Sequence, residues 1–350
     1  MILDTFIPEL AFSSALSNIT LVNVADDVNF ILSYKMSDGT YQEILSEPYT
    51  PDNDTNIYII GLQKIIDGYL EEIPVLDFKF RFEWGSNEIE YLSRIIKSSA
   101  ELDTDARKFV SQRFLTVMKG GKTVYPGSLQ YVSVYSFEPQ SVEVTATYRN
   151  LVTGGYESAS YPEGNTTANQ ITVIDVSPDK YMKEGKILVK YSVVCDARQI
   201  VHLVDNLSPT PSIEILFKNN FGVPETFCPI GNLSSERIFK NEYATIKGDY
   251  IKTNNSLDIE YISNTGIIDQ YTAEWLESDL FSSYSTFLVK NKAIYKGITI
   301  IDQTVKRSSD KTEQPAYEFK YRLSQHNQEV KQFNKFLFRL FDRTFDNTFN

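Results

Sequence analysis

The chain has 350 residues, 42% of them hydrophobic, and a formal net charge of −12 at pH 7, with a sequence pI near 4.8. This length and apolar content predict two or three globular domains, and the acidity, with no run of Lys or Arg, argues against nucleic acid as the main partner. The N-terminus lacks the basic region of a signal peptide, and no apolar stretch approaches the roughly eighteen residues of a membrane span. We therefore expect a soluble protein without membrane insertion, made in a cytoplasm.

The first predicted domain, residues 1–100, is rich in strands. Apolar residues alternate from Val28 to Met36, and after the turn sequence "SDGT" a second run starts at Tyr41, which predicts a β-hairpin. The spacing changes to that of a helix over residues 62–70 and returns to alternation over residues 75–84.

The second predicted domain, residues 105–207, follows a charged linker or boundary helix at residues 98–108. Its clearest strands are residues 142–148 and 187–193, where apolar and polar residues alternate. Alternation of this kind is what one layer of a β-sandwich requires. Pro209 and Pro211 then mark a second boundary.

The third predicted domain, residues 212–350, contains strands at residues 213–217, 257–262, 286–290, 293–301 and 317–323. A helix is predicted at residues 272–283, with Thr272 as its N-cap. The fold class predicted for the whole chain is mainly β, with two or three β-sandwich-like domains, a few short helices and a C-terminal aromatic helix or tail.

The C-terminal segment carries apolar residues every four positions. This spacing places them on one face of a helix, although the Asp, Asn and Thr residues of "DRTFDNTF" also allow an extended tail. We interpret the stripe as an assembly interface that packs on its own domain or in a neighbour's groove. The stripe consists of Phe333, Leu337, Phe341, Phe345 and Phe349.

Two short motifs suggest ligand binding but are incomplete. Gly121-Lys122-Thr123 matches the end of a phosphate-binding loop, yet Thr116 stands where the first Gly is needed. Asp52, Asp54 and Asn56 have the spacing of calcium ligands, but the loop lacks its Gly and its final Glu. A Gly-Gly turn and an Asx-rich loop explain the two stretches better.

Catalytic and metal-binding residues are equally poorly indicated. Cys195 and His202 invite comparison with a nucleophile and its base, but nearness in sequence does not place them in contact. His202 and His326 are the only histidines, so a zinc site is disfavoured. Glu274, Glu277 and Asp279 lie in "EWLESD", where the first turn of a helix favours acidic residues in any case. We predict no catalytic residue, no metal and no cofactor.

Several stretches resemble structural virion proteins of tailed phages and prophages of gut bacteria. They are "EILSEPYTPDNDTNIYIIGLQKIIDGYL", "IEILFKNNFGVPETFCPIGN", "ITIIDQTVKRSSDKTEQPAYEFKYRLSQHNQ" and the terminal "FDRTFDNTF". The resemblance is one of strand order and phrase and carries no catalytic signature. It implies a non-enzymatic tail, baseplate or fibre-adaptor subunit, assembled in the host cytoplasm and located in the virion.

The expected partners are other tail proteins and further copies of the chain in a ring or trimer, since symmetric assemblies bury repeated apolar patches. Contact with host glycans is compatible with this role. The alternative is a carbohydrate-binding β-sandwich protein of a bacterial surface system, against which the missing signal peptide counts. A glycan-cleaving enzyme would need two carboxylates at a fixed separation in a cleft, and the sequence indicates no such pair.

Overall fold

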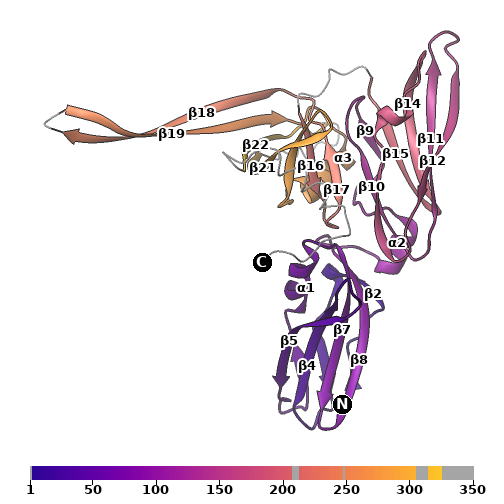
Figure 1. The fold of residues 1–350 in the computed structure, drawn as a ribbon, viewed down its shortest axis with the longest axis vertical. Coiled ribbons are helices and arrows are strands. Elements are labelled where there is room, and N and C mark those ends of the chain that lie inside the picture. The colour runs from indigo at the N-terminus through magenta and orange to yellow at the C-terminus, as the bar shows by residue number, and fades with distance from the viewer. Residues whose placement is uncertain (1, 207–212, 247–248, 305–313, 325–350) are drawn as a thin grey trace.

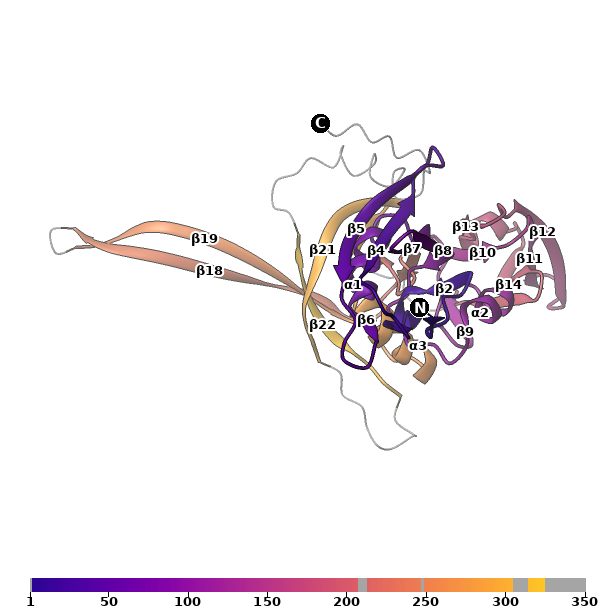
Figure 2. The same ribbon diagram turned by 90° about the horizontal axis from the view of Figure 1, so that it is seen from below.

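The computed structural model describes residues 2–206, 213–246, 249–304 and 314–324, with the backbone alone for residues 239–258 and 303–304. Its architecture is mainly β, with several sheets and few short helices, which confirms the predicted fold class. The strands form three modules, which we call N-terminal (residues 2–96), central (residues 106–204) and C-terminal (residues 214–323). Figures 1 and 2 show the modules around a common junction, with one long hairpin projecting from it.

The N-terminal module is a sandwich of two sheets. Aromatic side chains such as Phe30, Phe78 and Phe82 fill the space between them and are fully buried, because alternation along each strand directs them to the same face. Helix α1 (Leu62–Leu70) covers this core with Ile66 and Leu70. The larger sheet has the order β2 (Leu10–Phe12), β8 (Asn87–Ile96), β7 (Val75–Trp84), β4 (Val28–Lys35) and β5 (Tyr41–Tyr49), and the smaller β1 (Ile2–Leu3), β3 (Ile19–Val22) and β6 (Ile57–Ile59).

The central module is also a two-layered β structure, preceded by helix α2 (Ala106–Gln112). Its core lies between the sheets and includes Val144, Tyr191 and Val193. Both strands predicted here are present and pair with each other in antiparallel register. The larger sheet has the order β12 (Tyr156–Asn165), β11 (Ser141–Asn150), β14 (Lys186–Cys195), β15 (Arg198–Val204) and β9 (Gly121–Val124), and the smaller pairs β10 (Tyr131–Ser136) with β13 (Gln170–Asp175).

The C-terminal module is a seven-stranded sheet with a helical segment packed on it. Trp275, Leu276 and Leu280 of that segment pack against the sheet and are buried. The strand order is β17 (Pro224–Phe227), β16 (Glu214–Lys218), β20 (Thr286–Lys290), β21 (Ala293–Thr304), β22 (Glu318–Leu323), β19 (Asp249–Asn264) and β18 (Leu233–Ile246).

The predicted helix at residues 272–283 was placed incorrectly at both ends. It begins at Gln270, because Asp269 rather than Thr272 is the N-cap, and the Asp269 carboxylate accepts hydrogen bonds from the backbone N–H groups of Tyr271 and Thr272. Helix α3 (Gln270–Trp275) then continues as a π-helical turn, η3 (Leu276–Leu280). The wider turn ends the helical segment before residue 283.

Apolar side chains also fill the spaces between modules. Phe12 of the N-terminal module, Phe109 of α2 and Phe221 of the β16–β17 turn pack together, with ring centroids 5.3 to 5.6 Å apart. Between the central and C-terminal modules, Leu129 packs with Leu216. Whether the modules fold independently, as the domain ranges 1–100, 105–207 and 212–350 imply, stays a prediction.

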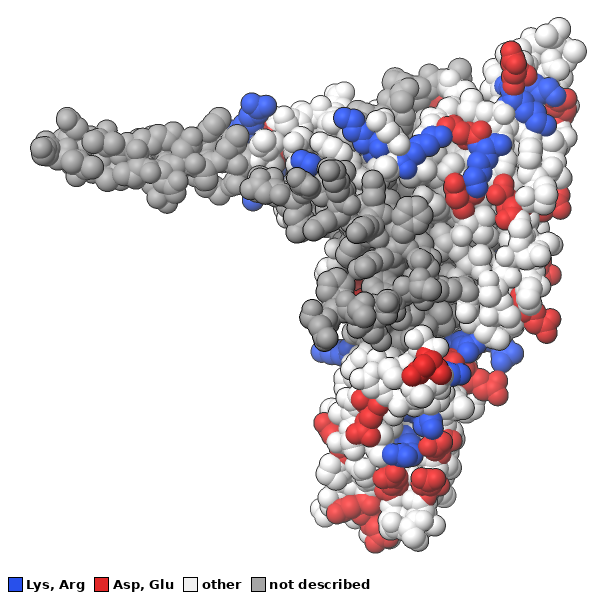
Figure 3. Space-filling model, viewed as in Figure 1, with Lys and Arg blue, Asp and Glu red and all other residues white. Residues whose placement is uncertain are grey.

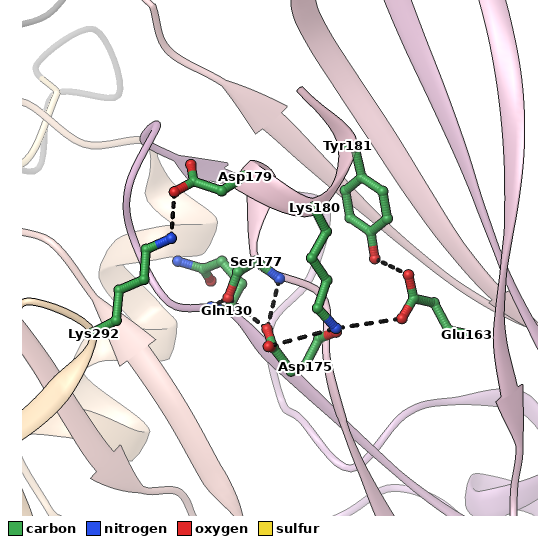
Figure 4. A network of polar contacts seen from close by, with 8 residues as sticks. All are labelled: Gln130, Glu163, Asp175, Ser177, Asp179, Lys180, Tyr181 and Lys292. Atoms are coloured by element: carbon green, nitrogen blue, oxygen red, sulfur yellow. Dashed lines mark hydrogen bonds and ion pairs between the residues drawn. The ribbon is translucent and has the colours of Figure 1, made fainter. Parts of the chain in front are cut away.

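Polar contacts reinforce the boundary between the central and C-terminal modules. Lys292, at the turn between β20 and β21, forms an ion pair with Asp179 of the central module. Figure 4 shows this pair beside a network in which Lys180 reaches Asp175 and Glu163, and Tyr181 donates to Glu163. Thr226 of β17 donates to the Leu129 carbonyl across the same boundary.

Candidate functional site

The residues proposed from sequence as an assembly interface lie outside the described residues. Phe333, Leu337, Phe341, Phe345 and Phe349 all fall within residues 325–350. Their role stays a prediction. The described residues offer two other features that suggest function, a projecting arm and a cleft at the junction of the three modules.

The projecting arm is the hairpin of β18 and β19. These strands pair along their whole length, from Leu233 with Ser263 to Ile246 with Asp249. The rest of the sheet supports only the base, where residues 261–264 of β19 pair with β22. Beyond this point, β18 extends from Glu236 to Ile246, which is about 35 Å at about 3.3 Å per residue. Figures 1 and 2 show the arm projecting from the sheet of the C-terminal module, away from the other two modules.

The cleft lies where the three modules meet and has a volume of about 820 Å³. One side is formed by Lys97 and the segment that links the N-terminal module to α2, and another by the helical segment with Trp275 and Asp279. The turn between β16 and β17 contributes Asn219 and Asn220. A space of this size is in the range of small-molecule sites.

The β16–β17 turn is held in place by its own side chains. Asn219 Oδ1 accepts hydrogen bonds from the backbone N–H groups of Phe221 and Val223, and Asn219 Nδ2 donates to the Leu115 carbonyl. Gly222 has a φ of +70°, and a Cβ there would lie 3.0 Å from Lys97 Cδ. The sequence "NNFG" therefore lets the turn enter the junction closely enough to form the floor of the cleft.

Two buried carboxyl groups lie next to this floor. Asp279 Oδ1 accepts a hydrogen bond from the Asn220 backbone N–H at 3.0 Å. Glu225 accepts from Asn219 Nδ2 at 3.2 Å and from Trp275 Nε1 at 2.5 Å. Burial is the main cause that raises the pKa of both carboxyl groups, and the neighbouring Glu225 raises the pKa of Asp279 further. Of the two, Asp279 borders the cleft.

Lys122 lies behind the same group of side chains. It is buried, and its Nζ lies 4.9 Å from the ring centroid of Trp275. Burial lowers the pKa of Lys122, while the nearby Glu225 opposes that effect. The buried amine of Lys122 therefore lies near the carboxyl groups of Glu225 and Asp279. Protonation states in which the charges of these three groups cancel avoid the cost of an unpaired buried charge.

The arrangement favours hydrogen bonding over acid–base chemistry on a ligand. Glu225 is fixed between Asn219 and Trp275, away from the cleft, and Lys122 contacts the Trp275 ring. Of the three ionisable side chains Lys122, Glu225 and Asp279, Asp279 alone lines the open space. Its Oδ2 atom is buried without a well-formed hydrogen bond in the described part of the chain. Burial raises the pKa of this carboxyl group, which donates a hydrogen bond when protonated and accepts one in either form.

The residues Cys195 and His202, weighed from sequence as nucleophile and base, have separate surroundings. His202 on β15 stacks on Tyr191 with ring centroids 4.6 Å apart, and burial lowers its pKa to about 3. Cys195 at the end of β14 lies beside Gln140 and Arg198, and burial raises the pKa of its thiol. A thiol made less acidic and a histidine kept neutral by burial serve the core of the central module.

The two incomplete ligand motifs also have structural roles. Asp52 Oδ1 accepts hydrogen bonds from the backbone N–H groups of Asp54 and Asn56, which is the Asx-rich loop expected. Gly120 precedes β9 with a φ of +90°, and Lys122 follows inside that strand. The lysine that resembles a phosphate ligand is therefore directed into the protein interior.

The acidic residues of "EWLESD" divide between surface and interior. Glu274 is exposed and accepts a hydrogen bond from Gln270, and Glu277 accepts one from Tyr317. Asp279 alone enters the buried cluster. Its neighbours Asn220 and Glu225 are more than fifty residues away in sequence. No local motif therefore predicts this buried cluster, and the pair of Asn residues before Phe221 is the one sequence feature that points to the turn.

Comparisons with known proteins place the chain in no family. No family model and no curated protein matches the sequence. Among solved structures, squid arrestin has 9% identity and a TM-score of 0.18, over 58% of this chain and 94% of that one. A DUF4785 family protein from Legionella pneumophila has 8% identity and a TM-score of 0.14, over 56% and 52% of the chains. The N-terminal four Ig domains of Dscam1 have 14% identity and a TM-score of 0.16, over 75% and 73%.

The described residues contain neither a membrane-spanning helix nor a metal-binding cluster. None of their helices is long and apolar enough to cross a membrane. No three or more His, Cys, Asp and Glu residues among them are grouped so as to hold a metal ion. The charge pattern is mixed, and Figure 3 shows mostly acidic side chains on the N-terminal module, with basic and acidic ones interspersed on the central module.

Proposed function

We propose that this chain is a non-enzymatic structural subunit of a phage virion, a tail, baseplate or fibre-adaptor component that assembles with copies of itself and with neighbouring tail proteins. The resemblance of its sequence to such proteins supports the virion as its location. The single observation that carries the assembly role is the β18–β19 arm, whose strands of 14 and 16 residues extend far beyond the sheet that anchors them.

The arm needs a partner for a thermodynamic reason. A two-stranded hairpin alone is marginally stable in water, and three or more strands or a packed face are normally required. Most strands are only about five or six residues long. An arm about 35 Å long therefore gains its stability when another subunit covers it.

The backbone of the arm also offers a means of attachment. Outside its base, neither the outer edge of β18 nor that of β19 pairs with another described strand. Each edge carries a row of free N–H and C=O groups, which pair readily with a strand of another chain. Repeated in every copy, such a contact closes into a ring or a trimer when the rotation between subunits allows closure.

Shortening the arm tests this function. Residues 238–258 are replaced by Asn-Gly, which joins the paired residues Arg237 and Ile259 by a two-residue turn. The matched control is Leu151→Ser with Val152→Ser, which changes two exposed apolar residues at the tip of the β11–β12 hairpin and leaves the arm intact. Mass is measured by light scattering over a range of concentrations.

We expect the full chain and the control to form the same oligomer, with a mass that is a multiple of 40.1 kDa. The shortened variant should be a folded monomer with an unchanged far-ultraviolet spectrum for its three modules. Equal oligomerisation of the shortened variant, or a full chain that stays monomeric at every concentration, contradicts the proposal.

A further inference from the structure

We propose that the junction cleft is a binding site for a neutral oligosaccharide, held by the amide, hydroxyl and carboxyl groups of its floor and stacked on tyrosines at its rim. The proposal concerns the cleft alone and does not depend on the assembly role of the arm. It rests on the size of the cleft, its neutral floor, its internally paired lysines and its exposed aromatic residues.

The floor of the cleft presents donors and acceptors without net charge. Asn220 Nδ2 donates to the carbonyl and to Oγ of Ser278, at 3.1 and 2.9 Å. Ser282 and Ser283 line the same space. Amides and hydroxyls can exchange such internal hydrogen bonds for bonds to sugar hydroxyl groups, which are both donors and acceptors.

Asp279 adds a buried carboxyl group whose second oxygen can take a further hydrogen bond. Its side chain is 1% exposed and borders the cleft, yet Oδ2 has no well-formed hydrogen bond in the described part of the chain. A buried polar atom without a partner is costly to the folded protein. A hydroxyl group of a bound sugar would remove that cost, which gives the ligand a preferred anchoring point.

Two lysines of the cleft already have partners within the protein, which makes them less available to an anionic ligand. Lys97 forms an ion pair with the Glu71 carboxylate, and Lys218 donates to the Glu71 backbone carbonyl. Other charged residues at the cleft, such as Lys119 and Glu274, are exposed and have both signs. A phosphate or carboxylate ligand would have to compete with Glu71 for Lys97, whereas a neutral sugar leaves that ion pair intact.

Two tyrosines make the rim suitable for sugar rings. Tyr284 is 98% exposed and Tyr271 is 53% exposed, and both line the cleft. Single exposed rings are common on protein surfaces, but these two belong to the lining of one cleft, where a ligand could contact both. The C–H face of a pyranose covers such a ring while its hydroxyl groups remain free to bind the floor.

Calorimetric titration of the full chain tests the proposal. The probes are neutral hexasaccharides of glucose, mannose, galactose and N-acetylglucosamine, with an oligogalacturonate of the same length as the anionic comparison. Three variants are used. Tyr284→Ala removes the exposed ring, Asp279→Asn replaces the acid by an isosteric amide, and Tyr156→Ala is the control, because Tyr156 is 70% exposed on the distant β12 strand.

We expect at least one neutral hexasaccharide to bind more tightly than the anionic probe. Tyr284→Ala should reduce its affinity about tenfold or more. Asp279→Asn should alter the affinity, and Tyr156→Ala should leave it unchanged. Binding of no neutral probe at concentrations up to about 10 mM overturns the proposal. So does preferential binding of the anionic probe, or equal loss with Tyr156→Ala. The oligomer mass is measured in the same samples, so that a failure of assembly is distinguished from a failure of binding.

Discussion

The boundary between the central and C-terminal modules should loosen as the pH rises, because of one carboxyl group. Glu214 begins β16, and its Oε1 accepts a hydrogen bond from the Leu129 backbone N–H at 2.6 Å. Burial raises the pKa of Glu214 to about 7, and it outweighs the hydrogen bond from Leu129 and the nearby charges of Lys122 and Lys292, which favour the carboxylate.

The direction follows from proton binding. Between about pH 4.5, the ordinary pKa, and about pH 7, the folded state holds a proton on Glu214 that the unfolded state has released. The free energy of unfolding therefore falls as the pH rises through this range. Each pH unit between the two pKa values corresponds to about 1.4 kcal/mol, so the cost at pH 8 is at most about 3.5 kcal/mol.

Glu214→Gln should remove this dependence. Glutamine keeps an oxygen that accepts from the Leu129 N–H and carries no charge at any pH. The chain has two Trp residues, and in a Trp84→Phe background the fluorescence of Trp275 reports on the C-terminal module. Urea unfolding is followed at pH 5, 6, 7 and 8. We expect the two proteins to be equally stable at pH 5 and the variant to be more stable at pH 8. A difference between them that stays constant from pH 5 to pH 8 would refute the reasoning.

Three further changes test other parts of the account. His202→Phe should protect the central module against acid. The low pKa of buried His202 makes the free energy of unfolding fall by up to about 5 kcal/mol as the pH drops from 6.5 to about 3. Acid titration followed by circular dichroism would show no difference between the two proteins if His202 were irrelevant. Arg198→Met should lower the free energy of unfolding by about 3 kcal/mol or more. The buried guanidinium donates to Gln140 and to the carbonyls of Val110 and Tyr135. Thermal unfolding measures the loss, with the substitution of an exposed residue, Arg149→Met, as the control. Asp269→Ala should cost about 1 kcal/mol through the lost N-cap of α3, whereas an equal loss in Asp269→Asn, which keeps an accepting oxygen, would argue against capping.

Much of the fold could be predicted because most strands have a buried face. The alternation at residues 75–84 reflects β7, where Phe78, Phe80 and Phe82 all enter one core. The arm could not be predicted in the same way, since a hairpin without a sheet or core behind it needs no alternation. Only residues 257–262 were assigned to a strand from sequence, within the 16 residues of β19.

The buried cluster beside the cleft escaped prediction for a topological reason. Lys122, Glu225 and Asp279 belong to β9, β17 and the π-helical turn, which meet only after the sheets have formed. Sequence reasoning explained this stretch by a Gly-Gly turn and gave Lys122 no position, whereas Lys122 is buried inside β9 over Trp275. The start of α3 was misjudged for a simpler reason, because Asp269 and Thr272 are both good capping residues.

Hydrogen exchange of the arm's backbone amides is the most direct test of the central claim that another subunit covers the β18–β19 arm. The full chain is compared at a concentration where it is monomeric and at one where it is assembled. The account predicts rapid exchange along the arm in the monomer and strong protection in the assembled form, with unchanged protection in the core strands β7 and β8. Arm amides that exchange at the same rate in both samples would contradict it.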